Sequence, residues 1–286
     1  MFNSEGPLAE YARERRRRHR LEWGVPEPEY DDLETEEGKR EFARRWRLEA
    51  EKNDLERVVF VTGGGNDNLA DVVNAWPEVF IGFAHHSPSQ KEAHQELRRA
   101  VDELGFRGYK IIAPVMDIPF DHPDLDPLWR FIADRGLPVL IHFGLLGTGG
   151  GVVYHPNINP LVLATTAHRY PDIPFVIAHF GCGYWGELLQ LCWGYPNIYI
   201  DTSGSNQWMR WMPYPLTLED LFRKAYETVG PERIVFGTDS SWFPRGFARH
   251  YLEEQLRVCR QLRMKEDEIE LIFAGNARRL LGLDGP

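Results

Sequence analysis

Short runs of apolar residues recur along most of the chain, and polar or turn-forming residues separate them. Seven runs are interpreted as buried strands, because their short length and their β-branched and aromatic content favour strands over helices. They cover 57–62, 80–85, 108–112, 138–142, 175–179, 198–201 and 234–238. Uninterrupted apolar runs are typical of parallel strands that are covered on both faces.

Between these runs, apolar positions follow the helical period of about 3.6 residues. The segment 91–104 is the clearest case, with Leu97, Ala100, Val101 and Leu104 on one face. Further helices are expected over 68–75, 125–134, 160–169, 185–191, 218–228 and 250–262, and Asn276 is expected to cap a last helix over 277–281. Strands that alternate with helices predict a parallel sheet with right-handed crossovers. The predicted fold class is therefore α/β, a distorted (β/α)8 TIM barrel.

A closed barrel of this class has eight strands, and the first one is cryptic or missing here. Residues 1–56 contain no apolar strand, but carry a basic run, Arg13 to Arg20, an acidic stretch, Glu27 to Glu37, and a polar-faced helical pattern over 36–52. Charge runs are usually solvated surface, with partner binding or a lid as the alternative. We therefore expect an N-terminal helical, charged segment over 1–56, a lid or an insertion, and the barrel over 57–286.

Composition narrows the function classes. The length of 286 residues suits one large domain, and the net charge of -10 argues against a general nucleic-acid binder. The three cysteines lack metal-type spacing, which favours a reduced, cytoplasmic setting. No apolar stretch approaches the ~18 residues of a membrane span, and no signal-peptide pattern follows the start. A small-molecule substrate is the expected partner, with no nucleic acid and no membrane.

Three of the predicted strands end in side chains that can bind a metal or move a proton. His142 ends the strand 138–142, His179 ends 175–179, and Asp239 follows 234–238. In a (β/α)8 barrel the carboxyl ends of the strands meet at the face that carries the chemistry, so these residues are expected to converge. Imidazole and carboxylate suit Zn²⁺ and related divalent ions. A histidine without a metal can instead act as general acid or base.

The segments around these residues resemble the amidohydrolase-related family. This is the branch of the amidohydrolase superfamily that contains aminocarboxymuconate-semialdehyde decarboxylase and the resorcylate decarboxylases. The resemblance is carried by His142 in LPVLIHFG, His179 in IPFVIAHFG and Asp239 in PERIVFGTDSSW, with GFRGYKI, PNIYIDTSG and FAGNARRLL in support. It spans roughly residues 57–283. It implies a distorted TIM barrel with one divalent ion, commonly Zn²⁺, His142 and Asp239 as metal ligands, and His179 as the catalytic acid/base. Asp239 is also a catalytic candidate, because it can accept the proton of a water molecule.

One family feature is missing from the chain. The family carries a His-x-His pair at the end of its first strand, which supplies two metal ligands, and this sequence contains no such pair. Either the natural protein starts upstream of Met1, or the chain is a variant that has lost its metal or recruited other ligands. His85 and His86 are candidates for that recruitment, and at most one of them faces the barrel interior, because adjacent strand residues point to opposite sides.

Three further residues are candidates for substrate binding. Arg245 can grip a carboxylate through its bidentate fork, against a surface or packing role. His155 lies in the loop after the His142 strand and can reach a substrate. Trp242 is a candidate for an aromatic-lined pocket, with core packing as the alternative. Lys110, inside the strand 108–112, is interpreted as a structural or substrate-contact lysine.

These residues together predict an amidohydrolase-related, metal-dependent hydrolase that acts on a small carboxylated or carbonyl-bearing substrate. A non-oxidative decarboxylase of the same family uses the same groups and is the first alternative. A metal-independent lactonase would suit the missing His-x-His pair. A non-enzymatic barrel is disfavoured because His142, His179 and Asp239 occur together. A homodimer is expected by analogy with the family.

Overall fold

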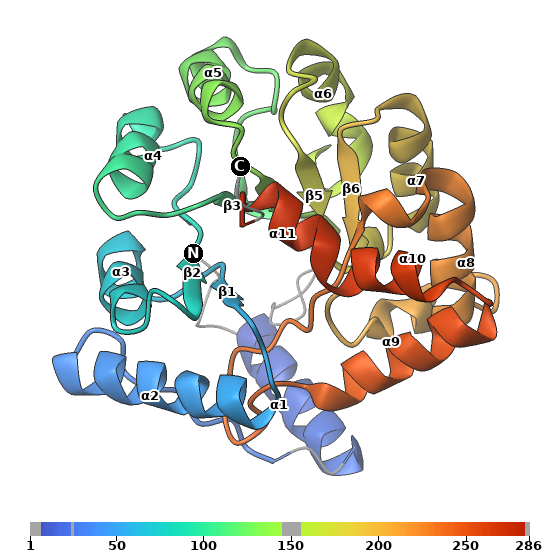
Figure 1. Ribbon diagram of the computed structural model, residues 1–286, viewed down its shortest axis with the longest axis horizontal. Coiled ribbons are helices and arrows are strands. Elements are labelled where there is room, and N and C mark those ends of the chain that lie inside the picture. Colours follow the sequence, from blue (N-terminus) through green and yellow to red (C-terminus); the bar gives the residue numbers. More distant parts are fainter. Residues whose placement is uncertain (1–6, 24–25, 145–155, 284–286) are drawn as a thin grey trace.

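The computed structural model describes residues 7–23, 26–144 and 156–283. Its parallel strands lie in the middle of the molecule, and helices surround them (Figure 1). The strands are β1 (Val58–Phe60), β2 (Phe80–Gly82), β3 (Tyr109–Ile112), β4 (Val139–His142), β5 (Phe175–Ile177), β6 (Ile198–Asp201) and β7 (Ile234–Val235). The helices are α1 (Pro7–Trp23), α2 (Glu36–Lys52), α3 (Asn66–Asn74), α4 (Ala93–Asp102), α5 (Asp126–Arg135), α6 (Ala164–Arg169), α7 (Trp185–Gly194), α8 (Leu218–Val229), α9 (Arg249–Gln261), α10 (Glu266–Glu270) and α11 (Asn276–Leu280).

The strands follow one another in chain order and all pairs are parallel. β1 pairs with β2, and β3 to β7 form a five-stranded sheet. Backbone hydrogen bonds continue between these two groups, since Ala84 N donates to Gly108 O (2.9 Å) and Lys110 N donates to Ala84 O (2.7 Å). Within the described residues, β1 and β7 do not pair and no eighth strand forms, so the barrel is open at that side. The α/β fold and all seven predicted strands are confirmed.

Four strands, β1, β2, β5 and β7, end two or three residues earlier than their apolar runs predicted. β5 stops at Ile177 because the backbone turns into the left-handed region at His179 (φ 57°). β7 stops at Val235 because the next backbone N–H, that of Phe236, donates to Ile272 O (3.0 Å) in a π-helical turn over Leu271–Gly275. The early ends of β5 and β7 depend on the backbone beyond the strand, which the hydrophobic pattern does not predict.

The expected cap at Asn276 was wrong. Helix α11 continues directly from the π-helical turn, and Asn276 is its first residue and fully buried. Its side-chain amide donates to Pro231 O (2.7 Å) and Ile234 O (2.8 Å). Asn276 therefore ties the C-terminal helix to the start of β7.

Alternate residues of the strands point to opposite faces of the sheet. One face packs on the surrounding helices and is almost fully buried; it includes Tyr109, Ile111, Val139, Ile141, Phe175, Ile177, Ile198, Ile200 and Ile234. On the other face, Lys110 pairs with Leu140, and Ile112 pairs with His142. The same register runs through Val176 and Tyr199, so Asp201 also points into the barrel.

Helix α2 packs across the open side of the barrel. Its Trp46, 2% exposed, contacts Phe60 of β1 (ring centroids 5.9 Å apart) and Phe243 after β7 (5.3 Å). Its Glu49 side chain accepts a hydrogen bond from Phe247 N (3.0 Å). Part of the segment expected to be a lid or an insertion thus bridges both ends of the sheet, while the domain boundary at residue 56 stays a prediction.

Helix α1 carries the basic run Arg13 to Arg20, whose described side chains are mostly exposed, as expected for solvated surface. Among the helices of the described residues, none is long and apolar enough to cross a membrane.

Candidate active site

His142 and His179 lie side by side at the carboxyl ends of adjacent strands. His142 is the last residue of β4, and His179 follows β5 by two positions. Their ring centroids are 5.1 Å apart in an edge-on arrangement, and both side chains are half-buried. The fold thus brings together two residues that are far apart in the sequence, at the end of the barrel where chemistry is expected.

The imidazole of His179 is held by a serine and a carboxylate from the end of β6. Its Nδ1 lies 2.7 Å from Ser203 Oγ and 3.2 Å from Ser203 O. The carbonyl oxygen can only accept, and Ser203 Oγ donates its own proton to Asp201 Oδ1. Nδ1 therefore carries a hydrogen, which leaves Nε2 as the nitrogen that can take up or release a proton.

Asp201 is the negative end of this chain of hydrogen bonds. Its Oδ1 also accepts from His179 N and Ser203 N, both at 3.1 Å, and it lies 4.0 Å from His179 Nδ1. Asp201 and Ser203 are buried, with 7% and 6% of their surface exposed. The relay of Asp201, Ser203 and His179 favours proton transfer at Nε2.

Sequence reasoning did not select Asp201 or Ser203 as site residues. Asp201 ends a predicted strand just as His142 does, and both residues lie in PNIYIDTSG. The place of Asp201 at the end of a predicted strand could have identified it as a candidate site residue. The contact between Ser203 and His179, which gives the pair its role, depends on the turn after β6.

Left-handed backbone conformations concentrate at the ends of these strands. His179 has φ 57°, Asn206 has φ 51° and Asp239 has φ 54°. Such angles are uncommon in non-glycine residues and cost of order 1–3 kcal/mol each, and they cluster at functional sites. The turns direct His179 and Asp239 away from the regular path of their strands.

Lys110 lies on the interior face of β3, and only 8% of its surface is exposed. Burial lowers the pKa of its ammonium group to about 8, and the negative charges of Asp201 and Asp239 oppose that shift. Within the described residues no side chain forms an ion pair or hydrogen bond with its Nζ. Lys110 therefore places a positive charge in the barrel interior that has no direct partner among the described residues.

Asp239 and Arg245 meet in the loop after β7. Arg245 Nη2 donates to the backbone oxygen of Asp239 (2.6 Å), and its guanidinium lies 4.8 Å from the ring centroid of Trp242. The Nε of Arg245 is buried and has no hydrogen-bond partner in the described part of the chain. The side chain of Asp239 is exposed. His155, the third predicted substrate contact, lies outside the described residues.

The two histidines proposed as recruited metal ligands are engaged elsewhere. His85 accepts a hydrogen bond from Gly65 N at Nε2 (3.2 Å), and its Nδ1 donates to Phe83 O (3.3 Å). His86 donates from Nε2 to Ala93 O (2.8 Å). Since a metal needs a free imidazole lone pair, these hydrogen bonds argue against recruitment of either residue.

The remaining donors do not complete a metal site. Among the residues that the structure describes, no three His, Cys, Asp or Glu side chains form a group that could hold an ion. His142 and Asp239 would supply two ligands, whereas catalytic zinc usually has three from the protein. The donor set of the described residues therefore does not fit the expected zinc ion.

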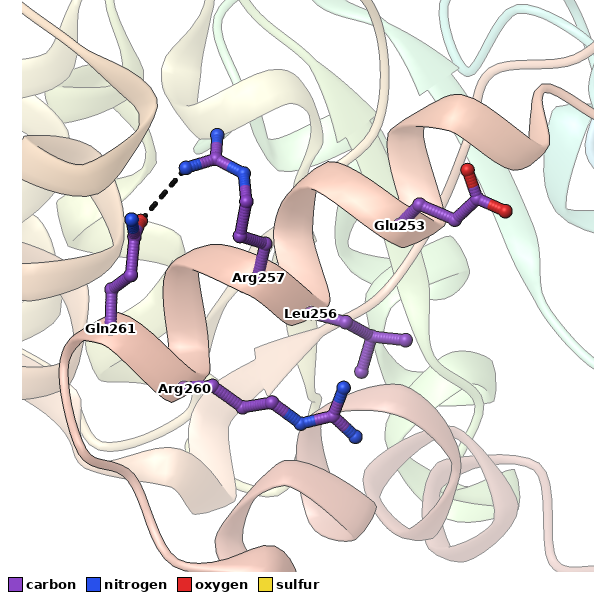
Figure 2. A pocket seen from close by; sticks show the side chains of 5 residues that line it. All are labelled: Glu253, Leu256, Arg257, Arg260 and Gln261. Carbon is purple, nitrogen blue, oxygen red and sulfur yellow. Dashed lines mark hydrogen bonds between the residues drawn. The ribbon is translucent and has the colours of Figure 1, made fainter.

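One hollow of the described surface, of about 550 Å³, is shown in Figure 2, and its lining side chains all come from α9. They are Glu253, Leu256, Arg257, Arg260 and Gln261. Arg257 donates to Gln261 Oε1 (2.9 Å) along the same helix. None of these residues belongs to the strand-end cluster, so this hollow is a feature of the helix surface.

The chain belongs to the amidohydrolase family, whose family model matches residues 37–283. It is similar to a 2-keto-4-carboxy-3-hexenedioate hydratase of Sphingobium sp., with 25% identity over 75% of this chain and 69% of the relative. It is also similar to the decarboxylase orsB of Emericella nidulans, with 26% identity over 76% of this chain and 75% of the relative. A 2-amino-3-carboxymuconate-6-semialdehyde decarboxylase of Dictyostelium discoideum is 24% identical over 77% of this chain and 66% of the relative.

Solved structures support the fold. An uncharacterised TIM-barrel protein from Bordetella bronchiseptica superposes with a TM-score of 0.64 at 24% identity, over 82% of this chain and 81% of that protein. The predicted family and the TIM-barrel class are thus confirmed, and the chain is an enzyme of the amidohydrolase family with decarboxylases and a hydratase among its relatives.

Proposed function

We propose that the protein is a non-oxidative decarboxylase that removes CO₂ from a small carboxylated substrate, with His179 as the proton donor. The main support is the hydrogen-bonded relay of Asp201, Ser203 and His179, which leaves Nε2 of the imidazole available for proton transfer. Two of the three relatives named above are decarboxylases, and this favours decarboxylation over hydrolysis.

The reaction needs one proton and releases one molecule of CO₂. His179 in its imidazolium form transfers a proton from Nε2 to the carbon that bears the carboxylate. The bond between this carbon and the carboxylate then breaks, and its electron pair returns to the substrate as CO₂ leaves. The neutral imidazole regains a proton from water. Asp201 stabilises the imidazolium through Ser203, at 4.0 Å from His179 Nδ1.

Arg245 and Trp242 are proposed to hold the substrate. The buried Nε of Arg245 has no hydrogen-bond partner among the described residues, so it can donate to a substrate oxygen. The guanidinium already stacks on Trp242, which fixes its orientation. Replacement of Arg245 by lysine should raise KM, because an ammonium group cannot reproduce the planar fork.

A divalent ion, with Zn²⁺ as the expected identity, stays a prediction from the family resemblance. The proposed proton transfer and bond cleavage do not involve a metal ion. Elemental mass spectrometry on the dialysed protein tests the prediction directly, with His142→Ala and Asp239→Ala as comparisons. About one ion per chain that both variants lose would assign these residues as ligands.

A screen of carboxylated substrates tests the proposed function. Small aromatic and unsaturated acids are offered, and CO₂ release is measured for the wild-type chain and for His179→Asn. Loss of the proton donor should reduce the rate by about 10²–10⁴-fold while the far-UV circular dichroism spectrum stays unchanged. Turnover in His179→Asn within tenfold of the wild type would refute the role of His179. The small-molecule partner, a homodimer and a cytoplasmic location remain predictions alongside this one.

Hydrolysis is the second candidate, because the exposed carboxylate of Asp239 can accept a proton from an attacking water. The same screen separates the two reactions, since hydrolysis of an ester or lactone releases a new carboxylate and no CO₂.

A further inference from the structure

We propose that Lys110 is the anion-binding residue of the barrel interior, and that its ammonium group receives a carboxylate oxygen of a small ligand. The identity of this ligand as the substrate rests on the proposed function. The binding itself does not require turnover, so it is testable with simple carboxylates.

The strand register places Lys110 where a ligand at the two histidines would lie. Lys110 pairs with Leu140 of β4, and His142 is two residues further along the same strand. Both side chains are therefore on the interior face, with Lys110 one step deeper in the barrel. Asp201 shares this face through the register of β5 and β6. Lys110 thus forms the floor below the strand-end cluster.

The ammonium group of Lys110 has no direct counter-ion in the part of the chain that the structure describes. It is 8% exposed, and no described side chain hydrogen-bonds to it. Burial of an unpaired charge is costly, and proteins normally pair such a group. The three N–H donors of Lys110 have no acceptor side chain among the described residues. A lysine in this largely buried position marks the floor as a place for a ligand with acceptor oxygens.

Within the described residues, neither neighbouring carboxylate forms an ion pair or hydrogen bond with Lys110. Asp201 Oδ1 already accepts hydrogen bonds from His179 N, Ser203 N and Ser203 Oγ. The side chain of Asp239 is exposed, so water screens its charge. Both carboxylates act on Lys110 from a distance, and burial still outweighs them in lowering its pKa. A further negative charge close to Lys110 would therefore stabilise its ammonium group.

The chemistry of the group defines the ligand class. An ammonium group donates hydrogen bonds and accepts none, so it favours carboxylate or another oxyanion over an uncharged amide of the same shape. A hydrogen bond to a charged group contributes about 1.5–3 kcal/mol, which corresponds to roughly tenfold to a hundredfold in affinity. The expected ligands are therefore small carboxylates, with the charged oxygen directed to the floor.

A thermal-shift titration with acetate tests the proposal, with acetamide as the uncharged probe at matched ionic strength. Acetate should raise the melting temperature of the wild-type chain more than acetamide does. Lys110→Met should lose this difference, with affinity for acetate reduced about tenfold or more. Lys91→Met is the matched control, because Lys91 is exposed outside the site, and it should keep the full shift.

Reductive methylation of the wild-type chain gives a second measurement that needs no variant. Peptide mass spectrometry should show that acetate slows methylation of Lys110, while acetamide does not and Lys91 is modified equally in all samples. Equal shifts in Lys110→Met and in the wild type would overturn the proposal, because the anion would then be held by other groups. Absence of any acetate-specific shift or protection in the wild type would also overturn it. A failed decarboxylation screen leaves these binding results intact.

Discussion

The proton-transfer role of His179 depends on Ser203, whose hydroxyl joins the imidazole to Asp201. Ser203→Ala should lower kcat by about 10–100-fold, because one charge-assisted hydrogen bond is lost, and leave KM nearly unchanged. Steady-state kinetics measure both parameters. Ser87→Ala, at an exposed position, is the control. An unchanged kcat in Ser203→Ala would remove Ser203 from the relay.

Gly237 provides the space for the buried carboxylate. A Cβ at this position would lie 2.6 Å from Asp201 Oδ2 and 2.8 Å from Ser203 Cβ. Gly237→Ala should therefore destabilise the fold by about 1–3 kcal/mol and disturb the relay. Urea denaturation measures the loss. Gly186→Ala in α7 is a matched control, because nothing lies within 4 Å of its Cβ, and it should be neutral or slightly stabilising.

The charged side chain of Lys110 should lower the free energy of unfolding at neutral pH. Its pKa falls from 10.5 to about 8 on folding, so the folded state disfavours the charged form. Below about pH 8 the cost is fully present, and it fades as the pH rises toward 10.5, because the unfolded chain then binds more protons than the folded chain. Lys110→Met should thus be more stable than the wild type at pH 7, by up to about 3 kcal/mol.

Denaturation of both proteins between pH 7 and 10.5 checks this sign. The difference between Lys110→Met and the wild type should shrink as the pH rises. A wild type that is more stable than Lys110→Met at pH 7 would show that Lys110 is a structural residue with a partner, against its interpretation as a residue reserved for a ligand.

At the scale of elements, the hydrophobic pattern predicted where strands begin better than where they end. The predicted range of β6, Ile198–Asp201, matches the observed strand. This strand is regular because both of its neighbours, β5 and β7, pair with it. β1, β2, β5 and β7 were predicted too long. At β5 and β7, a left-handed turn at His179 and a π-helical contact at Phe236 interrupt the apolar runs. Local patterns record burial, and they do not record these long-range backbone contacts.

Helix α2 is the element whose place could not be read from the sequence. Its residues predicted a polar-faced helix, but its Trp46 contacts both Phe60 of β1 and Phe243, which are far apart in the chain. Such pairings depend on the open side of the sheet, which exists only in the assembled barrel. The helix holds the loop that carries Asp239 and Arg245, since its Glu49 accepts from Phe247 N.

Trp46 should contribute much of the stability of this contact. Trp46→Ala should lower the free energy of unfolding by about 3–5 kcal/mol, because the side chain is 2% exposed and packs on both edges of the sheet. Denaturant titration followed by far-UV circular dichroism measures the change. Trp193→Ala is the control, with 81% of Trp193 exposed, and it should change stability by less than about 0.5 kcal/mol. Equal effects would mean that α2 is not part of the barrel's stable core.

At the scale of the whole molecule, the seven parallel strands of the described residues form an open barrel, whose interior is apolar at one end and polar at the other. Ile81, Phe83 and Leu281 form a small interior cluster, whereas the carboxyl ends of the strands carry His142, His179 and the relay of Asp201 and Ser203. This division is the one that TIM-barrel enzymes use, with stability at one end and chemistry at the other.

The central claim is decarboxylation with His179 as proton donor, and its most direct test is the source of the atoms in the product. Turnover of an identified substrate is followed by mass spectrometry in D₂O and, separately, in H₂¹⁸O. The account predicts CO₂, one deuterium at the carbon that lost it, no ¹⁸O in the organic product, and loss of deuterated product in His179→Asn. Incorporation of ¹⁸O into a new carboxylate without CO₂ would establish hydrolysis and contradict the account.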